Sequence, residues 1–271
     1  MNKNNIGAVL GEMGYMFIKN IQNHMQDFRL NKGDDVEWLL EPLDEISHPA
    51  DYVLDAFKDC TPWEWSYRLY FYKKGASSFY TPYNQYIKWY DDMEQGKSST
   101  SMLDLIDMEI VEELEPNPYD KSKIIKGYLD FCAANKIPGI WNDLIIPFTT
   151  IGIWQAVLLH QTVTLFPKGW HANYMKSIYV YSLEDIQMII KKHKRESYEF
   201  DHEKLATYLN RDDIMPSVEI DGDKAIASYF YWNDWSGFCR RIIPIEKQGH
   251  SVKFGKFERE KLVGYDCGIR Y

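Results

Sequence analysis

The sequence predicts an α+β fold in which a mainly helical N-terminal two-thirds packs on a C-terminal antiparallel β-sheet of four or five strands. Helical spacing of apolar residues dominates up to about residue 215, and period-two alternation with glycine turns dominates after it. The most apolar stretch, residues 144–181, lies between these parts. We expect one domain over residues 1–271, with a helical part over 1–215 and a sheet part over 216–271.

Charge is distributed unevenly along the 271 residues, whose net charge is −9. Residues 1–150 hold 24 acidic and 14 basic side chains, whereas the remainder holds 16 and 17. Binding to a phosphate backbone needs clustered positive charge, so this balance argues against a nucleic-acid partner. An acidic first half suits a basic protein partner.

Three helices are predicted before residue 76. The first covers residues 6–29, where Gly7, Gly11 and Gly14 would allow another element to pack closely. The second covers about 47–58. The third, residues 61–75, has a capping box at its start and Lys-Lys-Gly at its end. Residues 63–72 also alternate with period two and are rich in aromatics, which favours a strand; we choose the helix because both ends agree.

Further helices are predicted over 81–96, 101–115 and 120–132. Residues 95–101 (QGKSSTS) are the most linker-like stretch of the chain and are interpreted as a mobile loop. The helix over 101–115 has a strongly acidic exposed side, which is either a solvated face or an acidic docking surface.

Residues 144–166 contain no Asp, Glu, Lys or Arg, and we interpret them as a buried helix. A membrane span is disfavoured because Pro147 interrupts its start and Gln155, His160 and Gln161 would lie in hydrocarbon. The N-terminus does not resemble a secretory signal. A cytoplasmic location with reduced thiols is therefore expected, and the four cysteines show no metal-ligand spacing.

The remaining chain is predicted to form a strand over 176–181, helices over 183–194 and 202–211, and then two hairpins. The first hairpin turns at Asp221-Gly222 and the second at residues 247–250. The last residues, 263–271, alternate as a strand.

One candidate site contains Asp143, His160, His171 and Tyr174, with Trp170 and Asn173 beside them. A histidine paired with a carboxylate can act as a general base near neutral pH. No nucleophile motif accompanies them, so no catalytic role is assigned, and His160 has the alternative of being an ordinary buried histidine. No metal and no cofactor are predicted, because the spacing of the histidines supports neither.

A second candidate site is the predicted loop around residues 231–241, whose aromatic and arginine residues are of the types that dominate binding hot spots. Its members are Trp232, Asn233, Asp234, Trp235, Arg240 and Arg241. The alternative is a structured loop with one tryptophan packed beneath it.

Two functions are compatible with these observations. In general character the chain is similar to the immunity proteins of bacterial toxin systems, which implies a soluble protein that binds a protein partner, with inhibition of that partner as one form of this function. The second hypothesis is a small-ligand-binding protein or hydrolase-type enzyme with a pocket near His160 and His171, lined also by Trp170 and Tyr174. The first is slightly favoured; the absence of catalytic motifs argues against an enzyme, and the oligomeric state is left open.

Overall fold

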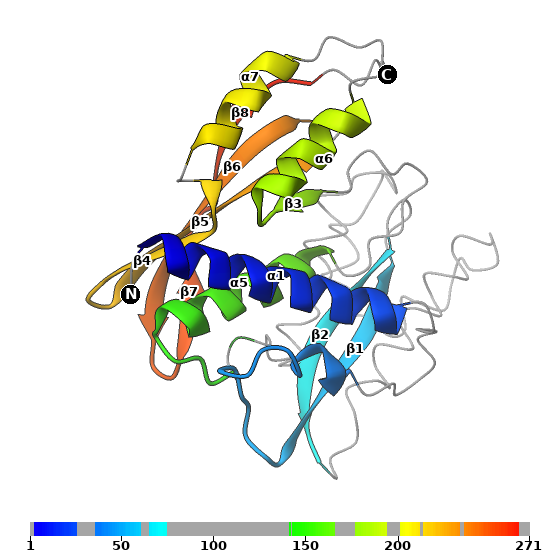
Figure 1. Cartoon of the computed structure of the whole chain (residues 1–271). Coiled ribbons are helices and arrows are strands. Elements are labelled where there is room, and N and C mark those ends of the chain that lie inside the picture. The colour runs from blue at the N-terminus through cyan, green and yellow to red at the C-terminus, as the bar shows by residue number, and fades with distance from the viewer. Residues whose placement is uncertain are drawn as a thin grey trace, which may run out of the picture.

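The protein was analysed as a computed structural model that describes residues 3–25, 36–60, 65–74, 141, 143–165, 177–193, 201–211, 214–233 and 236–265. The α-helices in these ranges are α1 (Lys3–Met25), α5 (Thr150–Leu165), α6 (Leu183–His193) and α7 (His202–Ala206). Two short 3₁₀ helices, η1 (Glu37–Leu39) and η4 (Thr207–Asn210), join them. Figure 1 shows how these elements are arranged.

An antiparallel six-stranded sheet organises the C-terminal part of the chain (Figure 1). Its strands are β3 (Ile178–Val180), β4 (Ser217–Asp221), β5 (Lys224–Asn233), β6 (Gly237–Gln248), β7 (Ser251–Phe254) and β8 (Glu258–Val263). The long strands β5 and β6 form its centre. Strands β3 and β4 both pair with the outer side of β5, and β7 and β8 both pair with the outer side of β6. Both predicted hairpins are confirmed, with Gly222 and Gly249 at positive φ in their turns.

The break between β7 and β8 lies opposite Pro244 of β6. Proline has no N–H to donate to a neighbouring strand, so pairing is interrupted at this point. Strand β8 pairs with β6 as far as Ile242, and β7 pairs with β6 only from Ile245 onward. Between these two regions, Gly255 donates its N–H to the Pro244 carbonyl at 2.8 Å. Residues 255–257 cross the gap, and this places Phe257 beside the middle of β6.

The central strands are buried on both faces, because alternate residues of a strand point to opposite sides. Ala225, Ala227, Tyr229 and Tyr231 of β5 belong to the core shared with α1 and α5. Phe230 and Trp232 belong to a second core shared with α6 and α7. We call these two sides of the sheet the α5 face and the α6 face.

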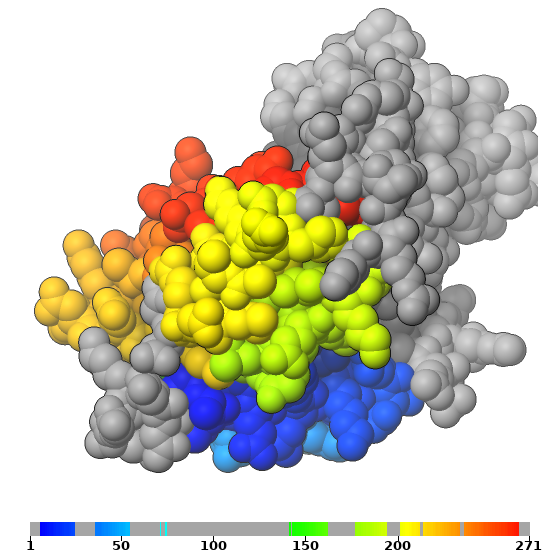
Figure 2. All heavy atoms as spheres, turned by 45° about the horizontal axis from the view of Figure 1, so that its top comes forward, coloured from blue at the N-terminus to red at the C-terminus, as the bar shows by residue number. Residues whose placement is uncertain are grey.

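The central helix begins at Thr150, because residues 144–149, which the prediction included, are not helical. With this difference, the predicted N-terminal and central helices are confirmed as α1 and α5. They pack together, and the Trp154 indole donates a hydrogen bond to the Leu10 carbonyl at 2.7 Å. The glycines of α1 permit a second close approach, to Tyr181 just after β3: a methyl group on Gly11 would overlap the Tyr181 carbonyl, and one on Gly14 would meet the Tyr181 ring. Tyr15 bonds to Ser182 and Asp185 at the start of α6, so α1 (blue) and α6 (yellow-green) lie side by side in Figure 2.

The helices predicted over 47–58 and 61–75 are wrong. These residues form a hairpin of two strands, β1 (Tyr52–Cys60) and β2 (Trp65–Lys73), paired without a register shift from Tyr52↔Lys73 to Cys60↔Trp65. The aromatic alternation within residues 63–72 was the correct signal for a strand, and the capping-type residues Thr61 and Glu64 lie outside the described residues. A partner strand nine residues long satisfies the backbone of β2, which a local propensity argument does not include.

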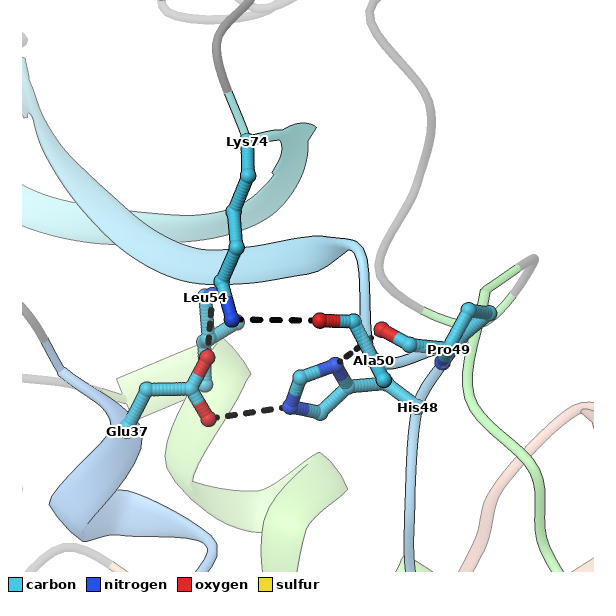
Figure 3. A network of polar contacts seen from close by, with 6 residues as sticks. All are labelled: Glu37, His48, Pro49, Ala50, Leu54 and Lys74. Carbon is cyan, nitrogen blue, oxygen red and sulfur yellow. Dashed lines mark hydrogen bonds and ion pairs between the residues drawn. The ribbon is translucent and has the colours of Figure 1, made fainter.

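Glu37 joins this hairpin to η1 (Figure 3). One carboxylate oxygen accepts from the Leu54 backbone N–H at 2.7 Å, and the other contacts His48 Nε2 at 2.9 Å. His48 Nδ1 lies 3.0 Å from the Pro49 carbonyl oxygen. Carbonyl and carboxylate oxygens only accept, so both contacts are hydrogen bonds only when the ring carries both protons. Lys74 donates to the Ala50 carbonyl on the same side.

The predicted fold class is therefore wrong in its main statement. The N-terminal two-thirds is not mainly helical, because a β-hairpin occupies residues 52–73. The sheet also has six strands rather than four or five, because β3, which precedes residue 216, joins it along β5. The helices predicted over 81–96, 101–115 and 120–132, and the loop 95–101, lie outside the described residues.

Candidate functional site

The best candidate site is built around Arg241, in the middle of β6 on the α5 face. Its guanidinium carbon lies 5.1 Å from the ring centre of Tyr231 on β5 and 5.9 Å from that of Phe257. The side chain is partly buried, and its Nε atom is shielded from solvent and has no hydrogen-bond partner among the described residues. No carboxylate lies within ion-pair distance of Arg241 there.

Three tyrosines surround this arginine: Tyr179 of β3 and Tyr229 and Tyr231 of β5. Burial raises the pKa of each phenol, that of Tyr179 to about 12, so all three keep their protons at neutral pH. Burial disfavours the charged form of Arg241, but the tyrosines outweigh this effect and the guanidinium pKa lies above its ordinary value. The group is thus one positive charge beside neutral phenols that can donate or accept hydrogen bonds.

His160, near the C-terminal end of α5, lies next to this group. Its ring stacks on Trp141 at 5.6 Å and contacts Phe254 at 4.3 Å and Phe257 at 4.8 Å. Burial, and then the positive charge of Arg241, lower the pKa of His160 to about 4. The imidazole is therefore neutral at pH 7.

Asp143 precedes α5. Burial raises the pKa of Asp143, and His250, in the turn between β6 and β7, opposes this rise. The charge that lowers the pKa of His160 is that of Arg241. The pairing of a carboxylate with a histidine at this site stays a prediction.

The two arginines predicted to act together point to opposite faces of the sheet, because they are consecutive in a strand. Arg240 lies on the α6 face, where it donates to Ser228 Oγ at 3.2 Å and stands 5.8 Å from the Phe230 ring centre. Trp232 is fully buried on that face, packed on His193 and Tyr265, as the alternative interpretation of a tryptophan beneath the loop had it. It is not exposed for partner contact.

One further predicted site residue, Asn233, ends β5, and its side chain accepts from the Ser236 N–H at 2.6 Å. Asp234 and Trp235 lie outside the described residues, as do Trp170, His171, Asn173 and Tyr174. The convergence of His160 with His171 thus stays a prediction. The tyrosines were missed by sequence reasoning, although the alternation of residues 225–231 with 239–245 does place Tyr229, Tyr231 and Arg241 on one face.

The described part of the chain holds no group of three or more His, Cys, Asp or Glu side chains suited to a metal. It also holds no helix that is long and apolar enough to cross a membrane. Comparison with known proteins found no matching family model, no similar curated protein and no similar solved structure.

Proposed function

We propose that this protein binds a small anionic ligand at Arg241. The observation that carries the proposal is a partly buried guanidinium with no acidic partner among the described residues. Removing a charge from water is costly, and proteins normally offset that cost with a paired counter-charge. A bound carboxylate or phosphate group would supply the missing counter-charge, and arginine matches both groups through two parallel hydrogen bonds.

The surroundings of Arg241 support a ligand with an aromatic or apolar body. Phe257, Phe254 and Trp141 continue from the arginine toward His160, and each of these aromatic side chains is partly exposed. Because His160 is neutral at pH 7, this side of the site offers ring contacts rather than charge. The ligand would place its anionic group on Arg241 and its apolar part on these rings.

The protein-binding hypothesis receives no support from the described residues. Its acidic helix over 101–115 lies outside them, and Trp232 is buried. It stays a prediction, to be tested by the same measurements with a basic protein partner.

The proposal is tested by isothermal titration of the purified chain with phenyl phosphate and benzoate, with phenol as the uncharged probe. We expect both anions to bind and phenol to bind at least tenfold more weakly. Arg241→Gln should abolish anion binding. Arg240→Gln removes the same charge one residue away on the opposite face, so it should leave the affinity within about twofold. Equal effects of the two variants, or no binding of either anion to the parent, would refute the proposal.

A further inference from the structure

The edge strand β8 separates its charges by face. Its sequence alternates acid and base as Glu258-Arg259-Glu260-Lys261, and it pairs with β6 in the register Arg241↔Arg259 and Cys239↔Lys261. Directly opposed residues of antiparallel strands share a face. Arg259 and Lys261 therefore lie on the α5 face with Arg241, whereas the two glutamates lie on the α6 face with Arg240. We call Arg241, Arg259 and Lys261 the basic strip.

The three cations of the basic strip lie close enough together to influence one shared group, the thiol of Cys239. The thiol of Cys239, buried between them, has a pKa that burial raises and that Arg259, Lys261 and Arg241 each lower. Cβ atoms of opposed residues are only about 5 Å apart, and residues two apart in a strand are about 7 Å apart. The three charged heads thus lie within reach of one short polyanion.

Among the described residues, the basic strip has no counter-charge paired with it. Opposed like charges such as Arg241 and Arg259 destabilise a sheet. None of the three has an ion pair there, and the bond from Arg259 to Ser236 Oγ, at 3.2 Å, goes to a neutral acceptor. Arg259 and Lys261 are exposed. A bound anion would offset the repulsion among these three cations more strongly than the solvent and salt that otherwise screen it.

We propose that the basic strip binds an oligophosphate group, meaning two or more linked phosphates, with one phosphate on Arg241 and the others on Arg259 and Lys261. This inference rests on the proposed function and names the class of its ligand. Linked phosphates fit because they carry several negative charges in a short chain, and both guanidinium and ammonium groups bind phosphate well. A ligand with a single charge would leave two of the three cations unpaired.

The test is titration of the parent protein with inorganic tripolyphosphate and with orthophosphate at pH 7.5 and fixed ionic strength. We expect tripolyphosphate to bind at least 100-fold more tightly than orthophosphate. Arg259→Gln and Lys261→Gln should each weaken tripolyphosphate at least tenfold and change orthophosphate binding less than threefold. Both side chains are exposed, so the variants should fold, and far-UV circular dichroism checks that they do.

Two control variants separate strip binding from general attraction. Arg240→Gln removes one positive charge from the α6 face, and Glu260→Gln removes one negative charge from β8; both should leave tripolyphosphate affinity within twofold. If Arg241→Gln abolishes binding of phenyl phosphate while Arg259→Gln and Lys261→Gln leave tripolyphosphate unaffected, the strip inference fails and the proposed function stands. If neither phenyl phosphate nor tripolyphosphate binds the parent, both fail.

Discussion

The two faces of the sheet are made from the same strands, yet they differ in the charges that stand opposite one another on β6 and β8. On the α6 face, Trp232, Phe230 and Phe238 pack under α6 and η4, and Arg240 stands across from Glu260. On the α5 face, the apolar packing against α1 and α5 gives way to Arg241, ringed by tyrosines and opposed by Arg259. A stable fold does not require an arginine that stands opposite another arginine. The α5 face therefore carries the features that packing alone does not explain.

The largest effect should come from breaking the core of the α6 face. Trp232→Ala removes a fully buried side chain and leaves a cavity, so we expect a loss of about 3 to 5 kcal/mol in the free energy of unfolding, measured with urea. Ile226→Ala is the matched control, because Ile226 lies on the same strand and face but is 50% exposed. Its loss should stay below about 1 kcal/mol, and a similar loss in both variants would mean that the α6 face is not packed as described.

The next effect concerns pH and the α5 face. The folded pKa of His160, about 4, lies below the unfolded value near 6.5, so its contribution to stability is complete above pH 6.5 and is lost as the pH falls toward 4. With about 1.4 kcal/mol per pKa unit, the loss is at most about 3 kcal/mol. Urea unfolding of the parent and of His160→Phe between pH 7 and 4 measures it. The parent should lose more stability than the variant over this range; parallel curves would show that His160 is not shielded.

A smaller loss in the free energy of unfolding should follow from a substitution that pushes α1 away from Tyr181, the residue after β3. Gly11→Ala places a methyl group against the Tyr181 carbonyl, and we expect about 1 to 3 kcal/mol of destabilisation from this overlap. The sign is informative, because alanine alone would favour the helix by about 0.5 to 1 kcal/mol. The exposed neighbour Glu12→Ala should change the free energy of unfolding by less than about 0.5 kcal/mol. A stabilised Gly11→Ala protein would refute the close packing.

The smallest effect on stability should come from Arg241→Met, which tests the difference between the two faces at a single residue. Breaking a buried ion pair costs about 3 to 5 kcal/mol, but Arg241 has no such partner among the described residues. Its removal also relieves the repulsion with Arg259. The free energy of unfolding should therefore stay within about 1 kcal/mol of the parent, while anion binding is lost. A drop of 3 kcal/mol would show that Arg241 serves the fold.

Sequence patterns located most of the helices and hairpins whose signals lie within one short stretch of the chain. The buried helix α5 follows from the uncharged run of residues 144–166, and the two C-terminal hairpins follow from alternation around glycine turns. The helical pattern of residues 202–211 likewise predicted α7, which the Asp201 side chain caps by accepting from the Lys204 N–H at 2.8 Å. Each of these signals involves only residues that are close together in the chain, so the sequence alone is enough to identify the element.

The candidate site was predicted only in part. His160 and Arg241 were both singled out by residue type, but they were assigned to different sites. Their approach depends on α5 lying over the sheet, and on the break opposite Pro244 that places Phe257 between them. The basic strip was overlooked for a related reason: only the register of β8 on β6 brings its three charges to one face.

The sequence by itself determined where α1, α5 and the two C-terminal hairpins lie, because hydrophobic periodicity and turn residues act within a few positions of the chain. Only the tertiary structure decided that residues 65–73 form a strand, that β3 joins the sheet, and that Arg241, Arg259 and Lys261 share a face. The physical reason is common to all three. A strand exists only through a partner elsewhere in the chain, and the register of that pairing sets which side chains meet.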